Sequence, residues 1–195
     1  MSSRAPYARD HLADDYPDRL ITLINFLRYQ VAWCACVLGA TTNRPMLGVA
    51  VAGVVVAWHL SVAVRPRAEL KLIVMTGLIG VTWESFLVAL DWVRYEGGHL
   101  AGLAPTWIIA LWLAFATTLN RSLNWLKGRT FLAAGLGSLA GALAWWAGER
   151  MGALHLSKGE FSLVVIGAGW ALLMPLLSTL AAWVDETAAA NTRRR

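Results

Sequence analysis

The sequence contains few charged residues and few cysteines. Only 15% of its 195 residues are charged and only two are cysteine, whereas soluble domains usually have about a quarter of their residues charged. Cys34 and Cys36 share one apolar segment, and side chains two positions apart on a helix point about 200° away from each other. A disulfide or a shared metal is therefore not expected at this pair. The low charge argues against an ordinary soluble domain.

Recognisable catalytic, nucleotide-binding and metal-binding motifs are also missing. The chain has no G-x-S-x-G elbow, phosphate-binding loop or dinucleotide fingerprint. Its four histidines are scattered without metal-ligand spacing: His11, His59, His99 and His155. The net charge of +5 comes from short segments between apolar blocks and forms no basic stripe, so nucleic acid is not expected as a partner. We expect no metal and no cofactor.

Long apolar blocks dominate the sequence. Apolar residues make up 57% of the chain, and 11 are Trp, which is favoured at membrane interfaces. Six blocks are long enough to cross a hydrocarbon core of about 30 Å: 20–40, 46–64, 70–92, 104–123, 130–147 and 161–184. We predict an all-α fold, a polytopic transmembrane helical bundle with six spans in one domain, 20–184. A polar tail, 1–19, and a basic tail, 185–195, flank it.

Lys and Arg alternate between the two sides of these predicted spans. Twelve lie on the side of the two termini and four on the opposite side, while Arg28 lies within a span. Cytoplasmic segments of membrane proteins carry the excess of Lys and Arg. The distribution therefore predicts that both termini are cytoplasmic.

The third span carries acidic residues, which are costly in a membrane. Gly77, Gly80, Glu84, Val88 and Asp91 fall within one helical sector of about 80°. An ionisable group at mid-bilayer costs about 2.5–3.5 kcal/mol on insertion scales, so such a group usually faces other helices or water. Glu84 and Asp91 are our candidate catalytic residues. In the alternative interpretation, Glu84 only fixes helix packing, for example through an ion pair with Arg28, and Asp91 is a solvated interfacial carboxylate.

Other spans carry polar residues that could bind a headgroup or orient Glu84. Arg28 in the first span, His59 in the second and Asn120 in the fourth are the candidate substrate-binding residues. His59 shares a helical face with Gly48, Ala52 and Val55, which is also the pattern of a packing face. We therefore consider a structural role for His59 beside the binding role.

Glycine and proline in the last two spans indicate close packing and a bend. Gly137 and Gly141 form a G-x-x-x-G spacing, which favours close helix contact and a possible homodimer. Pro175 predicts a kink or local unwinding of the sixth span.

Spaced Pro, Trp, Asn and Gly residues mark the second half of the chain. They lie among Pro105, Trp107, Leu111, Trp112, Phe115, Ala116, Leu119, Asn120, Ser122, Trp125, Leu126, Gly148, Gly152, Ala153 and the segment 170–175. This pattern resembles that of the bacterial inner-membrane family catalogued as domain of unknown function 2878. The resemblance implies an acidic residue after a glycine in the third span, the place of Glu84 after Gly80. It also implies a bacterial cytoplasmic membrane, and a link to membrane-lipid modification through neighbouring genes similar to cyclopropane-fatty-acid synthases and flavin amine oxidases.

Three functions remain open at this point. The first is a protein linked to membrane-lipid modification, as a small enzyme or as the membrane subunit beside a lipid-modifying enzyme partner, with membrane lipid as ligand. The second is a small-molecule or proton-coupled transporter, and the third is a non-catalytic membrane scaffold. The sequence does not decide whether the protein is an enzyme.

Overall fold

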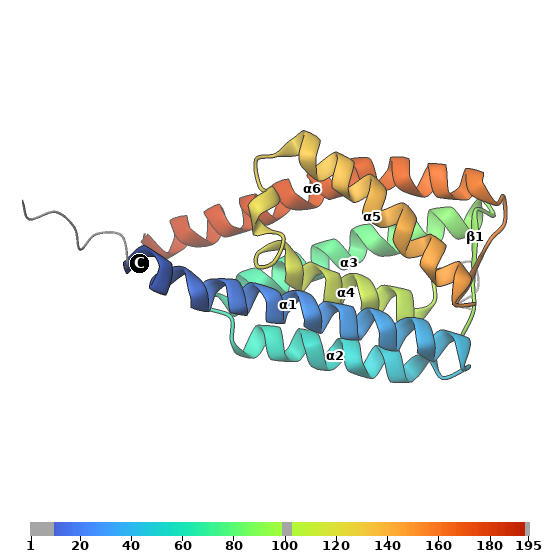
Figure 1. The fold of residues 1–195 in the computed structure, drawn as a ribbon, viewed down its shortest axis with the longest axis horizontal. Coiled ribbons are helices and arrows are strands. Elements are labelled where there is room, and N and C mark those ends of the chain that lie inside the picture. Colours follow the sequence, from blue (N-terminus) through green and yellow to red (C-terminus); the bar gives the residue numbers. More distant parts are fainter. Residues whose placement is uncertain (1–9, 99–102, 194–195) are drawn as a thin grey trace, which may run out of the picture.

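A computed structural model describes residues 10–98 and 103–193, with side chains for 19–98 and 103–190. These residues form six α-helices, one short 3-10 helix and two short strands (Figure 1): α1 Asp10–Thr41, α2 Pro45–Ser61, α3 Pro66–Ala89, β1 Val93–Tyr95, α4 Thr106–Leu119, η1 Asn124–Leu126, α5 Thr130–Arg150, β2 Leu154–Leu156 and α6 Glu160–Arg193. His99 and residues 1–9 of the predicted polar tail lie outside the described part of the chain.

The helices run side by side along the long axis of the molecule. Helices α1 and α2 pack on each other along one side, α5 and α6 pack along the other, and α3 and α4 lie between these pairs (Figure 1). The start of α1 and the end of α6 lie at the same end of the bundle. The all-helical architecture predicted from the sequence is confirmed.

Prolines and a turn set several of the helix limits close to the predicted ones. Pro45 and Pro66 occupy the first turns of α2 and α3, where the missing N–H costs no hydrogen bond. Helix α3 ends at Ala89, earlier than predicted, because Asp91 takes a left-handed φ of 53°. The Trp92 N–H then donates to the Leu87 carbonyl at 2.9 Å, which closes a Schellman turn.

Helix extends into both of the predicted tails. Helix α1 begins at Asp10 and α6 continues to Arg193. Helix α6 stays helical through Pro175, so of the two predicted alternatives local unwinding does not occur, and the kink stays a prediction. These two outer ends extend past the predicted apolar blocks because the added helical turns are polar and carry no hydropathy signal.

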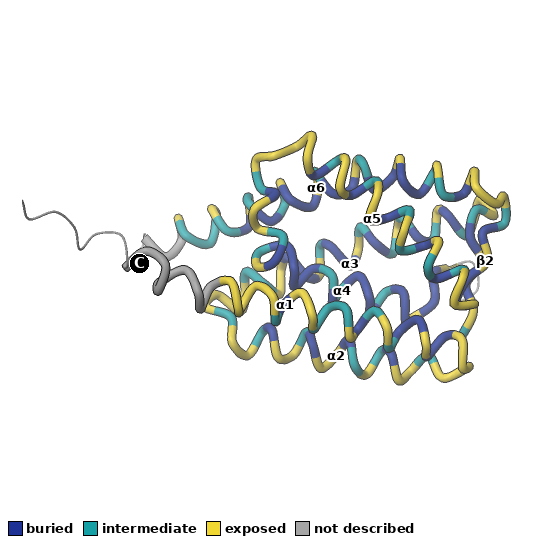
Figure 2. Tube along the Cα trace, in the orientation of Figure 1, coloured by how far each residue is buried: buried dark blue, intermediate teal, exposed yellow. Residues whose placement is uncertain are grey.

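The buried side of α2 is the predicted one, whereas the predicted face of α3 is buried only in part, because Val88 is half-buried and Asp91 is exposed. Gly48, Ala52, Val55 and His59 of α2 are buried, as their shared face predicted. Helix α4 is the most enclosed element, while the outer turns of the surrounding helices are exposed (Figure 2). The core therefore lies around α4.

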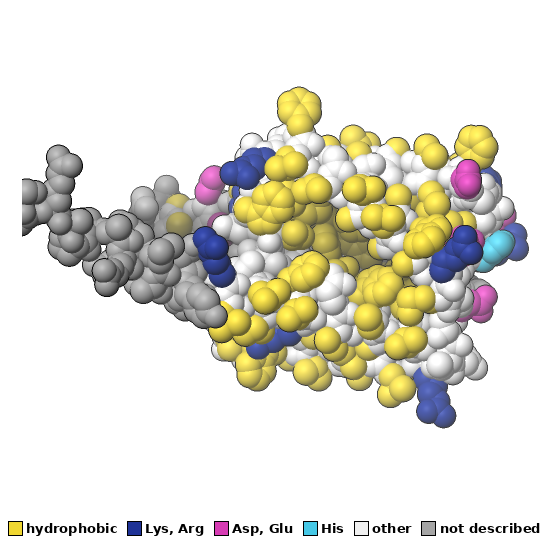
Figure 3. Space-filling view, viewed as in Figure 1, with side chains coloured by type: hydrophobic (Ala, Val, Ile, Leu, Met, Phe, Trp, Pro, Cys, Tyr) yellow, Lys and Arg dark blue, Asp and Glu magenta, His cyan; other side chains and the backbone are white. Residues whose placement is uncertain are grey.

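Large apolar side chains cover the outside of the bundle. Phe131, Phe161 and Leu172 are each more than 70% exposed, and apolar atoms cover most of the face shown in Figure 3. Four helices are long and apolar enough to cross a membrane: Arg19–Thr41, Pro66–Ala89, Thr130–Arg150 and Glu160–Ala190. The described structure is therefore that of a membrane-embedded, multi-pass helical protein.

A two-stranded antiparallel ribbon closes the end of the bundle opposite the two termini. Val93 pairs with Leu156, and Tyr95 pairs with Leu154. Val93 and Tyr95 are buried while Arg94 between them is exposed, as the alternation of side chains along a strand requires. The ribbon points Tyr95 into the bundle, which the sequence analysis did not anticipate.

Glycines let helices and indole rings approach closely at two places. A Cβ on Gly80 of α3 would lie 2.2 Å from Trp112 Cδ2, and one on Gly141 of α5 would lie 2.4 Å from Trp170 Cγ. Gly137 similarly lies against Met174. Gly137 and Gly141 therefore pack α5 on α6 within one chain, and the possible homodimer stays a prediction.

We expect Gly80→Ala to lower the free energy of unfolding by about 1–3 kcal/mol, because the new methyl group overlaps the enclosed Trp112 ring. Gly135→Ala is the matched control, since a Cβ at Gly135 would meet no atom within 4 Å. Removing a helical glycine there should stabilise by about 0.5–1 kcal/mol. Thermal unfolding of both variants in detergent checks the pair, and equal effects would contradict the packing described.

Candidate functional site

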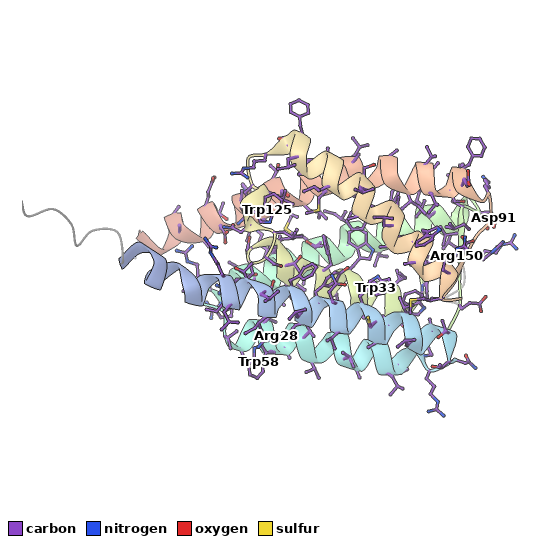
Figure 4. The ribbon with its side chains drawn as sticks, viewed as in Figure 1. Arg28, Trp33, Trp58, Asp91, Trp125 and Arg150 are labelled. Atoms are coloured by element: carbon purple, nitrogen blue, oxygen red, sulfur yellow. The ribbon has the colours of Figure 1, made fainter. Side chains whose placement is uncertain are left out.

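An apolar groove opens between α1 and α5, with α4 and α6 at its floor. We call it the α1/α5 groove. Its volume is about 490 Å³, within the range of about 300–1,000 Å³ typical of ligand sites. The hollow is visible on the face shown in Figure 3. Trp33 of α1 and Trp125 of η1 lie along it (Figure 4).

Aromatic rings form the inner wall of the groove. Trp170 of α6 stacks on Trp112 of α4, with ring centroids 5.1 Å apart and an interplanar angle of 16°. Phe115 meets Trp170 edge-on at 5.4 Å, and Trp145 of α5 is tilted against it at 5.9 Å. All four residues line the groove. We call Trp112, Trp145 and Trp170 the tryptophan wall.

A buried polar network lies behind this wall. The Glu84 side chain is fully buried, and its Oε1 accepts a hydrogen bond from Trp112 Nε1 at 2.9 Å. The Tyr95 hydroxyl donates to Glu84 Oε2 and accepts from Trp145 Nε1 at 3.0 Å. Glu84 and Tyr95 thus hold two of the three indoles of the wall in place, because each accepts a hydrogen bond from an indole N–H group.

Burial keeps Tyr95 in its donor form. Removal from water raises the pKa of Tyr95 well above its ordinary value, and the neighbouring Glu84 carboxylate raises it further. The hydroxyl therefore stays protonated at all ordinary pH values and remains a hydrogen-bond donor to Glu84. The protonated Tyr95 hydroxyl therefore holds the Glu84 carboxyl group and the Trp145 indole in a fixed arrangement.

Glu84 does not pair with Arg28. The Arg28 guanidinium lies 4.8 Å from the centre of the Trp58 ring, on the α2 side of α1 (Figure 4). Tyr95 and Trp112 satisfy Glu84 instead. The ion pair considered from the sequence is therefore wrong, because α1 turns Arg28 towards α2.

Asp91 lies apart from the groove, in the exposed turn after α3. Its carboxylate accepts two hydrogen bonds from Arg94, at 2.9 and 3.1 Å, and one from Ser157 at 3.1 Å. The Arg94 guanidinium holds the pKa of Asp91 below its usual value, and Ser157 adds to this. The structure thus gives Asp91 the geometry of a solvated turn residue and does not bring it together with Glu84.

His59 and Asn120 meet through a residue that the sequence analysis did not single out. His59 Nε2 lies 2.9 Å from Glu69 Oε2, and Asn120 Nδ2 donates to Glu69 Oε1 at 3.0 Å. Lys127 donates to Asn120 Oδ1 at 2.7 Å and to Asp185 Oδ2 at 2.6 Å. This cluster of five ties α2, α3, α4, the η1–α5 connection and α6 together at the end where α1 begins. Its polar groups bond mainly to one another.

The described residues contain no group of three or more His, Cys, Asp or Glu side chains that could hold a metal. None of the five sequence candidates lines the α1/α5 groove. The groove offers mainly apolar contact and indole faces, and the polar residues of its lining include Tyr29, Gln30 and Thr118. The arrangement suits binding of an apolar ligand more than acid–base catalysis.

The sequence analysis did not identify the residues that bond to its candidates Glu84, His59 and Asn120. They are Tyr95, Trp112, Trp145, Glu69 and Lys127. Trp112 belongs to the residues that carry the family resemblance, so a signal for it was present. Tyr95 had none, because the ribbon that points it towards Glu84 forms between two loops distant in sequence.

We expect Tyr95→Phe to lower the free energy of unfolding by about 1–3 kcal/mol, since it leaves Trp145 Nε1 and one Glu84 oxygen unpaired in the core. Tyr29→Phe is the control, because the Tyr29 ring packs on Phe115 and its hydroxyl has no partner among the described residues. Denaturant unfolding in detergent measures both. An unchanged Tyr95→Phe midpoint would contradict the network.

Comparison with known proteins agrees with the resemblance carried by the sequence. No curated protein and no solved structure matches the chain. Residues 22–176 match the family described as Protein of unknown function (DUF2878). This match spans most of the chain, from α1 to the middle of α6, and includes the α1/α5 groove and Glu84. The chain therefore belongs to the DUF2878 family.

Proposed function

We propose that this protein is a membrane-lipid-binding subunit that holds an apolar lipid chain in the α1/α5 groove and presents it to a lipid-modifying enzyme partner. The observation that carries the proposal is a groove with an almost entirely apolar lining, placed between two helices long enough to span a membrane. In that position the hydrocarbon chains of the surrounding lipids are the ligands at highest local concentration.

The architecture supports six spans, although two helices are short. At about 1.5 Å per residue, the 17 residues of α2 extend about 26 Å and the 14 of α4 about 21 Å. A lipid-facing helix must match a hydrocarbon core of about 30 Å. Helix α4 is mostly buried by its neighbours, so it does not need to meet that requirement. Both helices lie alongside the long ones in Figure 1.

Cation–aromatic pairs at both ends of the bundle support two membrane interfaces. Lys71 lies 4.1 Å from the Trp183 ring at the end where α1 begins, and Lys158 lies 3.8 Å from the Trp92 ring near the ribbon. Trp and long basic side chains anchor helices at headgroup level. With the excess of Lys and Arg at the end where α1 begins, this supports both termini in the cytoplasm of a bacterium.

The geometry favours a positioning role for Glu84 over catalysis. Glu84 has no exposed surface and is separated from the groove by Trp112 and Trp145. A general acid must reach its substrate within hydrogen-bond distance or through one water. In this proposal Glu84 holds the tryptophan wall in place, and the catalytic groups belong to the partner enzyme.

We expect Ala140→Phe to reduce the lipid that co-purifies with the protein at least threefold, because Ala140 lines the groove and a phenyl ring there occupies it. Leu139→Phe adds a ring at an exposed position outside the groove and should leave the retained lipid unchanged. Mass spectrometry of lipids bound to each purified variant checks this. Equal retention by the two variants would contradict lipid binding in the groove and favour a scaffold.

We expect Glu84→Gln to restore the lipid profile of a deletion strain, because the glutamine oxygen can still accept from Trp112 and its NH2 group can donate to the Tyr95 hydroxyl oxygen. Total-lipid mass spectrometry of wild type, deletion and the complemented strains measures it. Failure of Glu84→Gln at normal membrane levels would assign Glu84 an acid–base role. Identical profiles in wild type and deletion would remove the lipid link and leave transport or scaffolding.

A further inference from the structure

Two polar side chains in the lining of the α1/α5 groove have no partner in the described part of the chain. Three lining residues carry polar groups other than an indole N–H: Tyr29, Gln30 and Thr118. The Thr118 hydroxyl donates to the Phe115 carbonyl at 2.7 Å, whereas the Tyr29 hydroxyl and the Gln30 amide form no hydrogen bond among the described residues. Both residues are half-buried, and neither has a fully enclosed unpaired atom. Their polar atoms are therefore open to a ligand.

Helical spacing directs both side chains towards the groove. Four residues of α1 line it: Phe26, Tyr29, Gln30 and Trp33. Residues at this spacing, i, i+3, i+4 and i+7, share one face of a helix. The Tyr29 ring also contacts Phe115, another lining residue, edge to face with ring centroids 5.6 Å apart. The groove thus carries two open polar groups beside each other on a mainly apolar surface.

Tyr29 and Gln30 lie just inside the end of the bundle where α1 begins. Asn25, about one turn earlier on α1, accepts a hydrogen bond from Ser122 at 2.8 Å, and the connection that contains Ser122 also carries the exposed Arg129. Exposed basic side chains at the end of a bundle mark the headgroup level. Tyr29 and Gln30 follow Asn25 by about 6 and 7.5 Å along the helix, and the interfacial layer of a bilayer is about 5–7 Å thick on each side. The two side chains therefore lie at the depth where acyl chains join their headgroups.

The chemistry of these groups limits what they bind. A tyrosine hydroxyl and a glutamine NH2 group are both hydrogen-bond donors, and no charged side chain lines the groove in the described part of the chain. A carboxylate that accepted these bonds would have no counter-charge in the lining, which is costly away from water. An ester carbonyl is a neutral acceptor, and a diacyl glycerolipid has two of them where its chains join the headgroup. One such lipid can pair with both donors while an acyl chain fills the apolar part of the groove.

We propose that the ligand of the α1/α5 groove is an ester-linked glycerolipid, held by hydrogen bonds from Tyr29 and Gln30 to its ester carbonyls. Its headgroup lies at the end where α1 begins, and an acyl chain runs along the tryptophan wall towards the ribbon. The inference rests on the proposed function and specifies the class of lipid and its direction in the groove. Tyr29 and Gln30 are then specificity-determining residues of the groove.

The test compares an ester-linked and an ether-linked lipid of equal chain length on the delipidated full protein in detergent micelles. The probes are radiolabelled dipalmitoyl phosphatidylglycerol and its dihexadecyl ether analogue, which lacks both carbonyls, and retention is measured against protein-free micelles. Hydrogen bonds from the two donors predict that wild type retains the ester lipid about fivefold better. The double variant Tyr29→Phe with Gln30→Leu removes both donors, so it should bring the two retentions to parity. Tyr29→Phe alone should leave a preference of about twofold.

Thr118→Val is the matched control. It also removes a hydroxyl from the groove lining, but that hydroxyl donates within its own helix, to the Phe115 carbonyl. The preference for the ester lipid should therefore stay at about fivefold. The double variant removes no hydrogen bond between described residues, so its thermal unfolding midpoint in detergent should match that of wild type.

The outcomes separate this inference from the proposed function. Equal retention of the two lipids by wild type, or a preference that survives the double variant, would overturn the roles of Tyr29 and Gln30 and leave lipid binding in place. Loss of the preference in Thr118→Val would do the same, because the preference would then depend on the packing of the lining. Retention of neither lipid by wild type would overturn both. Palmitate, added as a competitor, should displace the ester lipid weakly, and stronger displacement than by the unlabelled ester lipid would overturn the glycerolipid assignment.

Discussion

The structure is organised around one requirement, that a carboxyl group in an apolar helical core must have hydrogen-bond partners. Glu84 is fully buried, and both of its oxygens accept bonds, from Tyr95 and from Trp112. Leaving either oxygen unpaired would cost a large part of the net stability of a protein. Several distant segments are arranged to meet this need: Gly80 gives the Trp112 ring room against α3, and the β1–β2 ribbon delivers Tyr95.

The same network also fixes the shape of the groove on the other side of the tryptophan wall. Because Glu84 and Tyr95 hold Trp112 and Trp145 by their N–H groups, the rings present their faces to the groove in one fixed arrangement. Trp170 is stacked within that arrangement and backed by Gly141. A preformed apolar surface loses little conformational entropy when a ligand binds. The buried acid thus acts on the groove through the indoles, without touching its contents.

A second polar cluster performs a similar structural task at the end where α1 begins. Five residues connect five segments there through short hydrogen bonds: His59, Glu69, Asn120, Lys127 and Asp185. Asn25 adds a tie between α1 and the end of α4, since it accepts from Ser122 and donates to the Thr117 carbonyl. Both ends of the bundle are therefore closed by polar contacts, while the middle is held by apolar packing. The groove lies in that middle region, where the lining contains no charge.

The sequence by itself determined the helical class, the approximate helix limits and the buried face of α2, because these follow from local hydropathy and helical periodicity. It also marked Glu84 as a residue in need of partners, since a carboxyl group in an apolar block is costly wherever it lies. Only the tertiary structure decided which partners it has. Tyr95 and Trp112 lie 11 and 28 residues from Glu84, and Arg28, the candidate from helical spacing, faces α2 instead. The groove, too, exists only where α1 and α5 stand apart over α4 and α6, a relation between helices that no single segment encodes.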